Sequence, residues 1–250
     1  MDFSPLWISL EVSLFSTIVA TLIALPLAKI ITRLKIRRII DILFSFPLVL
    51  PPTVVGFFLL ILFGRNSAFG RLLTVLRVNI VFTITGAVIA AVVVSFPIIY
   101  RTARVSFEQV DSDLVDMARL MGYGGVSLFL HVYIPLSFHQ LAAAVTLAFA
   151  RAIGEFGATI MVAGNIPGKT RTMSVAGYTA MQGGDRKLAY TWTVIILCLS
   201  FTMLFLIELF AERQYRSGKN APRTQGTRPD WFPSSVPDGC NNTPYPAAHP

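Results

Sequence analysis

Long uncharged apolar runs alternate with short charged connections along most of this chain. A helix needs about 20 mostly apolar residues to cross a hydrocarbon layer roughly 30 Å thick. Five runs approach or reach this length, and they cover residues 12–28, 42–63, 78–100, from 132 to the first charge at 151, and 188–207. The pattern therefore predicts an all-α integral membrane protein with about five transmembrane helices.

The second run contains helix-breaking residues within the sequence "FPLVLPPTVVGF". Pro47, Pro51, Pro52 and Gly56 weaken or remove backbone hydrogen bonds of a helix at this point. In lipid, such breaks are tolerated only where neighbouring helices or a water-filled cavity satisfy the freed backbone groups. The sequence thus indicates either a helix that lines the bundle interior beside a path, or a kink that only fits the packing.

The fourth run leads into "FARAIGEFGATIMVAGNIPG", which places Arg151 and Glu155 four residues apart. Such a pair lies on one face of a helix, and ionisable residues at membrane depth usually face a bundle interior or an aqueous pathway. Small residues, including Gly154 and Gly157, allow close helix contact or local unwinding here. We expect this region to line a path, with an ion pair that only fixes the packing as the alternative. A sixth span or a re-entrant piece at 153–167 stays open.

The connection over residues 108–135 is too apolar for a flexible loop and too charged for a span. Its apolar residues at helical spacing predict a short amphipathic surface helix with the apolar stripe turned inward, and these are Val110, Leu114, Met117 and Met121. The residues predicted to end this helix are Gly122, Gly124 and Gly125. The acidic residues suit an anionic lipid surface poorly and favour a protein partner, and they are Glu108, Asp111, Asp113 and Asp116.

Composition and charge agree with a membrane protein and exclude several other classes. Apolar residues make up 54% of the chain, charged residues 14%, and the mean hydropathy is +0.65. The net charge of +8 comes from Lys and Arg at the edges of the apolar runs rather than along one basic face, which excludes nucleic acid as a partner. These residues are most frequent after the first, third and fifth runs, so the N-terminus is predicted outside and the C-terminus inside.

Three further functions are not supported by the residues. The segment "AGNIPGKT" at 163–170 has the spacing of a phosphate-binding loop, but it follows a membrane helix, and Pro167 removes one N–H from the phosphate cradle. An intramembrane enzyme would need a Ser–His or HExxH arrangement, and a secondary transporter or channel would show internal repeats; neither is recognisable. Two cysteines and three scattered histidines offer no metal site. We expect no catalytic residue, no metal and no cofactor in this chain.

The end of the chain differs in character from the rest. Residues 217–250 are rich in Pro, Asn, Gly and Ser and lack any periodicity. Such a composition cannot bury enough apolar surface to fold. We therefore expect a transmembrane domain over 1–216 and a disordered cytoplasmic tail over 217–250.

The connection also carries the spacing of a known family motif. Asp116, Met117 and Ala118, followed by Gly122 and then by Val132, Ile134 and Pro135, stand at the positions of the cytoplasmic EAA loop of ABC-importer permeases. The letters depart from the motif, since Asp116 replaces Glu and Met117 replaces the first Ala, but the spacing is kept throughout. Together with "SLEVSLFSTIVATLIALPLA", "FPLVLPPTVVGFFLLILFGR" and the segment from "FARAIGEFG" to "AMQGGD", the chain resembles bacterial molybdate permeases of the ModB type over residues 9–215.

This resemblance implies the transmembrane subunit of a type I ABC importer, in which the 108–135 region contains a coupling helix that docks on the ATPase. The residues implied in ATPase coupling are Asp116, Met117, Ala118, Leu120, Gly122, Tyr123 and Pro135. The residues expected at the translocation path or gate are Arg151, Gly154, Glu155, Phe156, Gly157, Asn165, Thr170, Arg171 and Thr172. The implied partners are a cytoplasmic ABC ATPase, an extracytoplasmic molybdate-binding protein, a second copy of the chain and the lipid of the cytoplasmic (inner) membrane. Tungstate or sulfate stays open as the substrate in place of molybdate.

Overall fold

A computed structural model describes residues 2–32, 34–76 and 78–219, with side chains described up to residue 205 in the last helix. Every regular element in these ranges is a helix, which confirms the predicted all-α fold. The elements are α1 (Ser4–Ile31), α2 (Arg37–Val49), α3 (Pro52–Phe63), α4 (Ala68–Val75), α5 (Ile84–Glu108), α6 (Ser112–Leu120), α7 (Gly125–Leu128), the π-helical turn η1 (Phe129–Tyr133), α8 (Ile134–Ile153), α9 (Gly157–Ala163), α10 (Met173–Gln182) and α11 (Arg186–Lys219).

The chain divides into two units. Residues Met1–Glu212 form one compact unit, and the second unit is Arg213–Pro250. The predicted disordered tail lies, from residue 220 onward, outside the described residues.

The long apolar helices match the runs seen in the sequence. Within the described residues, four helices are long and apolar enough to cross a membrane, and they are Ser4–Ile31, Ile84–Glu108, Gly125–Ile153 and Arg186–Phe205. The bent pair formed by α2 and α3 brings the number of spans to five if it crosses as one unit. The predicted number of about five spans is therefore confirmed.

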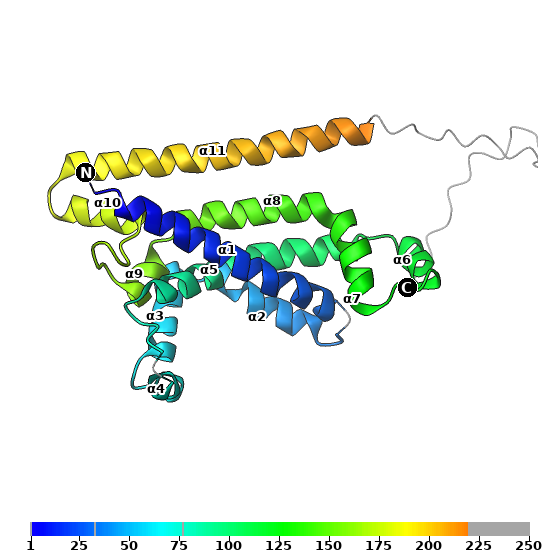
Figure 1. Cartoon of the computed structure of the whole chain (residues 1–250), viewed down its shortest axis with the longest axis horizontal. Coiled ribbons are helices and arrows are strands. Elements are labelled where there is room, and N and C mark those ends of the chain that lie inside the picture. The colour runs from blue at the N-terminus through cyan, green and yellow to red at the C-terminus, as the bar shows by residue number, and fades with distance from the viewer. Residues whose placement is uncertain (1, 33, 77, 220–250) are drawn as a thin grey trace, which may run out of the picture. The chain divides into compact units, whose positions relative to one another are not determined.

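Helices α1, α5 and α8 lie against one another and form the centre of the compact unit (Figure 1). On α1, Ala20, Ala24 and Ala28 follow at intervals of four residues and are fully buried. Small side chains on one face allow two helix backbones to approach closely, which is the usual way that membrane helices pack. This face of α1 packs against Ile99 and Ala103 of α5 in a shared apolar cluster.

The second apolar run is bent rather than straight. Helix α2 ends at Val49, α3 begins at Pro52, and the two axes differ by 111°. Pro51 and Pro52 lack an N–H, so they cannot continue the hydrogen-bond ladder of α2, whereas Pro52 is well tolerated at the first position of α3. The predicted break is confirmed, and it turns the chain instead of only kinking a span.

Helix α3 packs directly on the short helix α9. A Cβ atom added at Gly56 would lie 2.7 Å from Ala158 Cα, and one added at Gly157 would lie 2.9 Å from Thr53 N. Both distances are shorter than side chains tolerate, so glycine at these two positions is required for the contact. The predicted close helix contact at the small residues after Arg151 thus occurs, with α3 as the neighbour.

Two helix boundaries differ from the apolar runs. Helix α5 begins at Ile84 rather than Val78, because the Thr83 hydroxyl accepts a hydrogen bond from the Gly86 N–H and caps the helix there. The fourth run extends towards the N-terminus as far as Gly125, through α7 and η1. In η1 the Ile134 N–H donates to Phe129 O, five residues back, next to Pro135, which has no N–H to donate. Apolarity alone does not reveal either boundary.

The two ends of the bundle are occupied by different elements (Figure 1). At one end, Val115 and Ala118 of α6, which lies against α7, belong to the same apolar cluster as Ile31 of α1 and Phe107 of α5. At the other end, α9, α10 and the first turns of α11 cluster, and Trp192 packs against the end of α8 and the start of α10. The two groups of predicted functional residues therefore lie at opposite ends.

Candidate functional site

The predicted amphipathic helix exists as α6, and its start is fixed by an acidic residue. The Asp111 carboxylate accepts a hydrogen bond from the Asp113 N–H at 2.9 Å. A carboxylate at this position satisfies a free N–H and interacts favourably with the positive end of the helix dipole. Glu108 belongs to the end of α5 rather than to this helix, and its carboxylate is 3.1 Å from Arg104 Nη1.

The glycine of the family motif ends α6. Gly122 has φ +89°, its N–H donates to Arg119 O at 2.9 Å, and the Tyr123 N–H donates to Ala118 O at 3.0 Å. This pair of hydrogen bonds is the Schellman arrangement, which needs a left-handed residue just after the helix. Gly122 thus ends the helix as predicted. Gly124 and Gly125 do not, since they cap and begin α7.

The prediction for the inward face is confirmed for Val110, which packs against the core just before α6, and is wrong by one residue for the helix itself. The buried residues of α6 are Val115 and Ala118, whereas Leu114, Met117 and Met121 are exposed. The helix carries apolar residues on two faces, and the smaller side chains pack against the bundle because they allow a closer approach. The larger ones are left on the outer surface.

An exposed apolar face therefore projects from this end of the bundle. It consists of Leu114, Met117, Leu120 and Met121, and we call it the α6 outer face. Leu120 is 90% exposed and Met117 is 59% exposed. Contiguous exposed apolar side chains of this size mark an interaction surface.

The remaining predicted coupling residues surround this face or support it. Asp116 Oδ1 lies 2.8 Å from Arg119 Nη1, and both side chains are exposed. The Tyr123 ring lies 5.7 Å from the His131 ring, and Pro135 is exposed in the first turn of α8. Ala118 is buried and positions the helix rather than contributing to its surface.

Arg151 and Glu155 form an ion pair, but not along one helix. Helix α8 ends at Ile153, so Glu155 lies in the break before α9. Its Oε2 is 2.6 Å from Arg151 Nη1, and its Oε1 accepts a hydrogen bond from the Ala158 N–H at 2.9 Å. The Glu155 side chain is 2% exposed and that of Arg151 is 35% exposed. Both carboxylate oxygens are thus used to join the end of α8 to the start of α9, which favours a role in holding this junction.

The segment 153–167 does not form a sixth span. It contains α9, whose seven residues are far fewer than the number needed to cross a bilayer. Phe156 precedes α9, and its ring lies 4.8 Å from the Tyr178 ring of α10. The chain turns at Gly164, where φ is +70°, and a Cβ there would meet the Phe82 ring at 3.0 Å.

The other predicted path residues lie beyond the C-terminal end of α9. Asn165 Oδ1 accepts a hydrogen bond from Arg171 Nε at 2.7 Å, and the buried Thr170 hydroxyl accepts one from the Ile166 N–H at 3.2 Å. These contacts close the 165–171 loop on itself. The predicted path residues therefore form two clusters, one at each end of α9.

Thr172 lies just before α10 and is buried, and its hydroxyl has no hydrogen-bond partner among the described residues. The N–H of the next residue, Met173, donates to the Ser9 hydroxyl at 2.8 Å. Ser9 belongs to α1, so this bond ties the start of α10 to the first helix of the chain.

A polar network ties α2 to α5, and this network was not predicted from the sequence. The hydroxyl of the fully buried Tyr100 donates to Asp41 Oδ1 at 2.6 Å, and Arg104 Nη1 lies 3.2 Å from Asp41 Oδ2. Arg37 Nη1 extends the network to Glu108 at 3.4 Å. The spacing of Tyr100, Arg104 and Glu108 indicates one helix face, but their pairing with Asp41 joins residues 59 apart and is visible only in the fold.

Comparison with known families and proteins gives consistent matches. A family model described as binding-protein-dependent transport system inner membrane component matches residues 15–216. The chain is 38% identical over 209 residues to the putative molybdenum transport system permease protein YvgM of Bacillus subtilis (strain 168), covering 82% of this chain and 92% of that protein. It is also 38% identical over 216 residues to the molybdenum transport system permease protein ModB of Escherichia coli (strain K12), covering 83% and 94%.

More distant similarities extend the comparison. A probable sulfate transport system permease protein cysT of Helicosporidium sp. subsp. Simulium jonesii is 28% identical over 204 residues, covering 81% of this chain and 76% of that protein. Among solved structures, a chain of the MetNI methionine ABC transporter in an inward-facing conformation matches with a TM-score of 0.64 at 18% sequence identity, covering 84% of this chain and 94% of that one. This last similarity concerns the fold.

Proposed function

The chain belongs to the family of binding-protein-dependent transport system inner membrane components, and on that premise we propose that it is the permease subunit of an ABC importer for molybdate. The observation that carries the choice of substrate is the order of similarity, since the permeases named for molybdenum transport resemble this chain more than the sulfate permease does. Tungstate and sulfate are the alternative substrates. The chemistry that drives transport, ATP hydrolysis, takes place in a partner subunit.

In this proposal the α6 outer face binds the ATPase. Met117 and Leu120 are both more than half exposed, and their apolar surface supports a hydrophobic contact with a protein groove. Val115 and Ala118 are buried in an apolar cluster shared with α1, α5 and α7, and α6 contacts α7, so a movement of the docked ATPase is transmitted to the membrane helices. The side of the membrane that carries α6 is then cytoplasmic, with the N-terminus outside and the C-terminus inside.

The translocation path is proposed to pass the other end of the bundle, near the two clusters flanking α9. Arg151 is partly exposed and Arg171 is partly buried, so each offers guanidinium N–H groups that can attract a tetrahedral oxyanion. Glu155 and Asn165 occupy part of that donor capacity, which favours weak, transient contact with the anion. An external binding protein supplies the substrate, and a second copy of the chain completes the path on a two-fold axis.

Uptake by reconstituted vesicles tests the proposed function. The vesicles contain the permease, its ATPase and the extracytoplasmic binding protein, and molybdate, tungstate and sulfate are compared at equal concentration with ATP inside. We expect ATP-dependent uptake of molybdate above that of sulfate. Uptake of sulfate alone, or uptake of molybdate without the ATPase, would overturn the proposal.

Orientation is tested separately with reporters fused at each end of the chain. A reporter that is active only in the cytoplasm is expected to work at the C-terminus and to fail at the N-terminus. The reverse result would place α6 on the outer surface and remove the basis for ATPase docking.

A further inference from the structure

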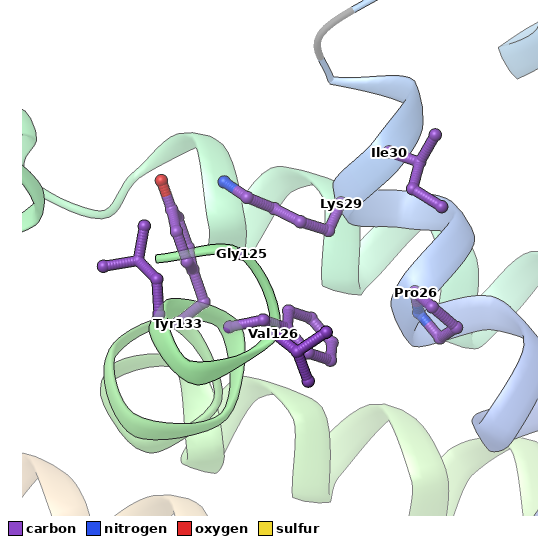
Figure 2. Close-up of a pocket in the computed structure, with 8 residues that line it drawn as sticks. Pro26, Lys29, Ile30, Gly125, Val126 and Tyr133 are labelled. Carbon is purple, nitrogen blue, oxygen red and sulfur yellow. The ribbon is translucent and has the colours of Figure 1, made fainter. Parts of the chain in front are cut away.

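A cavity of about 370 Å³ lies between the end of α1 and the α7–η1 segment that precedes α8. Apolar side chains make most of its wall, among them Pro26 and Ile30 from α1 and Val126 from α7 (Figure 2), together with Phe129 from η1. Ile30 and Val126 are largely exposed, at 56% and 72%, so the cavity opens on the surface of the bundle.

Lys29 and Tyr133 supply the polar edge of this cavity. The Lys29 side chain extends from α1 towards Tyr133, and its Nζ lies 3.1 Å from the centroid of the tyrosine ring (Figure 2). This is a cation–π contact, which fixes the ammonium group at the rim while its aliphatic stem follows the apolar wall. The Tyr133 hydroxyl points to the same side as the ammonium group (Figure 2).

The depth of the cavity in the membrane follows from the sequence of α1. Residues 12–28 are uncharged, so Lys29 is the first charged residue at this end of the span Ser4–Ile31. Lys29 therefore lies where hydrocarbon gives way to lipid headgroups. Pro26 lies one turn before Lys29, on the hydrocarbon side of this level, so the apolar wall of the cavity reaches the depth of the lipid acyl chains.

The positive charge of the residues next to the cavity indicates which lipid headgroup would bind there. Residues 29–38 contain five basic residues and no acidic one. Clusters of Lys and Arg next to a membrane helix attract anionic headgroups, and basic pockets between helices bind them. We propose that this cavity binds an anionic phospholipid, with an acyl chain along Pro26, Ile30 and Val126 and the phosphate accepting hydrogen bonds from Lys29 and Tyr133. This site is independent of the anion that the protein transports.

The permease–ATPase complex, purified and stripped of lipid, allows a direct test. Binding of short-chain phosphatidylglycerol is measured by native mass spectrometry, with short-chain phosphatidylcholine and inorganic phosphate as comparisons. We expect the anionic lipid to bind in preference to the zwitterionic one and to resist competition by inorganic phosphate. Equal binding of the two lipids, or displacement by inorganic phosphate alone, would overturn the proposal.

Substitutions locate the lipid at this cavity. Lys29→Gln is expected to weaken phosphatidylglycerol binding more than about fivefold, because it loses a hydrogen bond to the phosphate in addition to one positive charge near the surface. Lys35→Gln removes the same charge from the same connection without altering the cavity wall, and is expected to weaken binding by less than that. Val126→Trp fills the groove with the charges intact and is expected to reduce binding as well. An equal loss for Lys29→Gln and Lys35→Gln would indicate diffuse attraction and exclude the site.

Two conservative variants distinguish a loss of lipid binding from a loss of folding. Lys29→Arg keeps the cation and is expected to retain the lipid, whereas Tyr133→Phe keeps the ring and loses the hydroxyl donor, and is expected to bind more weakly. Undiminished binding by both Lys29→Gln and Tyr133→Phe would refute the assignment of the phosphate to this rim.

Discussion

Arg151 and Glu155 form the ion pair at the junction of α8 and α9. Replacing one of them is expected to lower the free energy of unfolding more than replacing the other. Replacement of Arg151 by Gln leaves the Glu155 carboxylate, 2% exposed, with the Ala158 N–H as the remaining partner that the structure gives it. An uncompensated buried charge lowers the free energy of unfolding by about 3–5 kcal/mol. We expect a loss of about 3 kcal/mol for Arg151→Gln, because one hydrogen bond to the carboxylate persists. Replacement of Glu155 by Gln keeps an oxygen for the Ala158 N–H and leaves Arg151, which is 35% exposed and stays hydrated. We expect Glu155→Gln to lower the free energy of unfolding by about 1 kcal/mol.

Thermal unfolding of the purified complex measures this difference. For a chain of this size, about 1 kcal/mol shifts the midpoint by roughly 2–4 °C, so Arg151→Gln is expected to lower it by about 6–12 °C and Glu155→Gln by about 2–4 °C. The double variant is expected to be more stable than Arg151→Gln alone, since it removes the unpaired carboxylate. A larger loss for Glu155→Gln than for Arg151→Gln would refute this reasoning. Loss of transport in Glu155→Gln with an unchanged midpoint would assign the carboxylate to the path instead of the junction.

Three further predictions concern α6, with the turn that follows it, and the packing of α3. Gly122→Ala forces a side chain into a left-handed conformation that costs about 1 kcal/mol, and is expected to lower coupled uptake, whereas Gly124→Ala, at a negative φ, is expected to leave it unchanged. Met117→Asp is expected to weaken ATPase binding about tenfold or more in a pull-down titration, without a change in thermal midpoint; unaltered binding would contradict docking at the α6 outer face. Gly56→Val is expected to destabilise the unit by about 1–3 kcal/mol, because its Cβ meets the backbone of α9, while Gly177→Ala, with ordinary contact distances, serves as the control in the same unfolding assay.

The sequence predicts the existence of the long helices well, because each one depends on a local run of apolar residues. It predicts the break after Val49 as well, since Pro51 and Pro52 remove backbone donors wherever they occur. The angle of that bend is not predictable from the prolines. It depends on the packing of α3 against α9, two segments that lie about a hundred residues apart in the chain.

In the candidate sites too, features that depend on neighbouring residues in the chain are predictable, and features that depend on packing between distant segments are not. Gly122 is predictable, because the spacing of the family motif and the need for a left-handed residue point to the same position. The inward face of α6 is not, because periodicity cannot decide which of two apolar faces packs against the bundle. The pairing of Arg151 with Glu155 follows from their spacing, but the end of α8 between them does not. The Asp41–Tyr100 bond lacks any local signal.

Helix α8 gives the molecule a mechanical property. Its 20 residues correspond to a length of roughly 30 Å at about 1.5 Å per residue. At its first end the chain bends into η1 and α7 (Figure 1), and its other end carries Arg151 and leads into the α9 junction. A tilt of about 5° at the first end displaces the second by roughly 2.6 Å over such a length. Helix α8 is thus a lever arm, long enough to turn a small rotation at the α6 end of the bundle into a displacement about as wide as a water molecule at the other end.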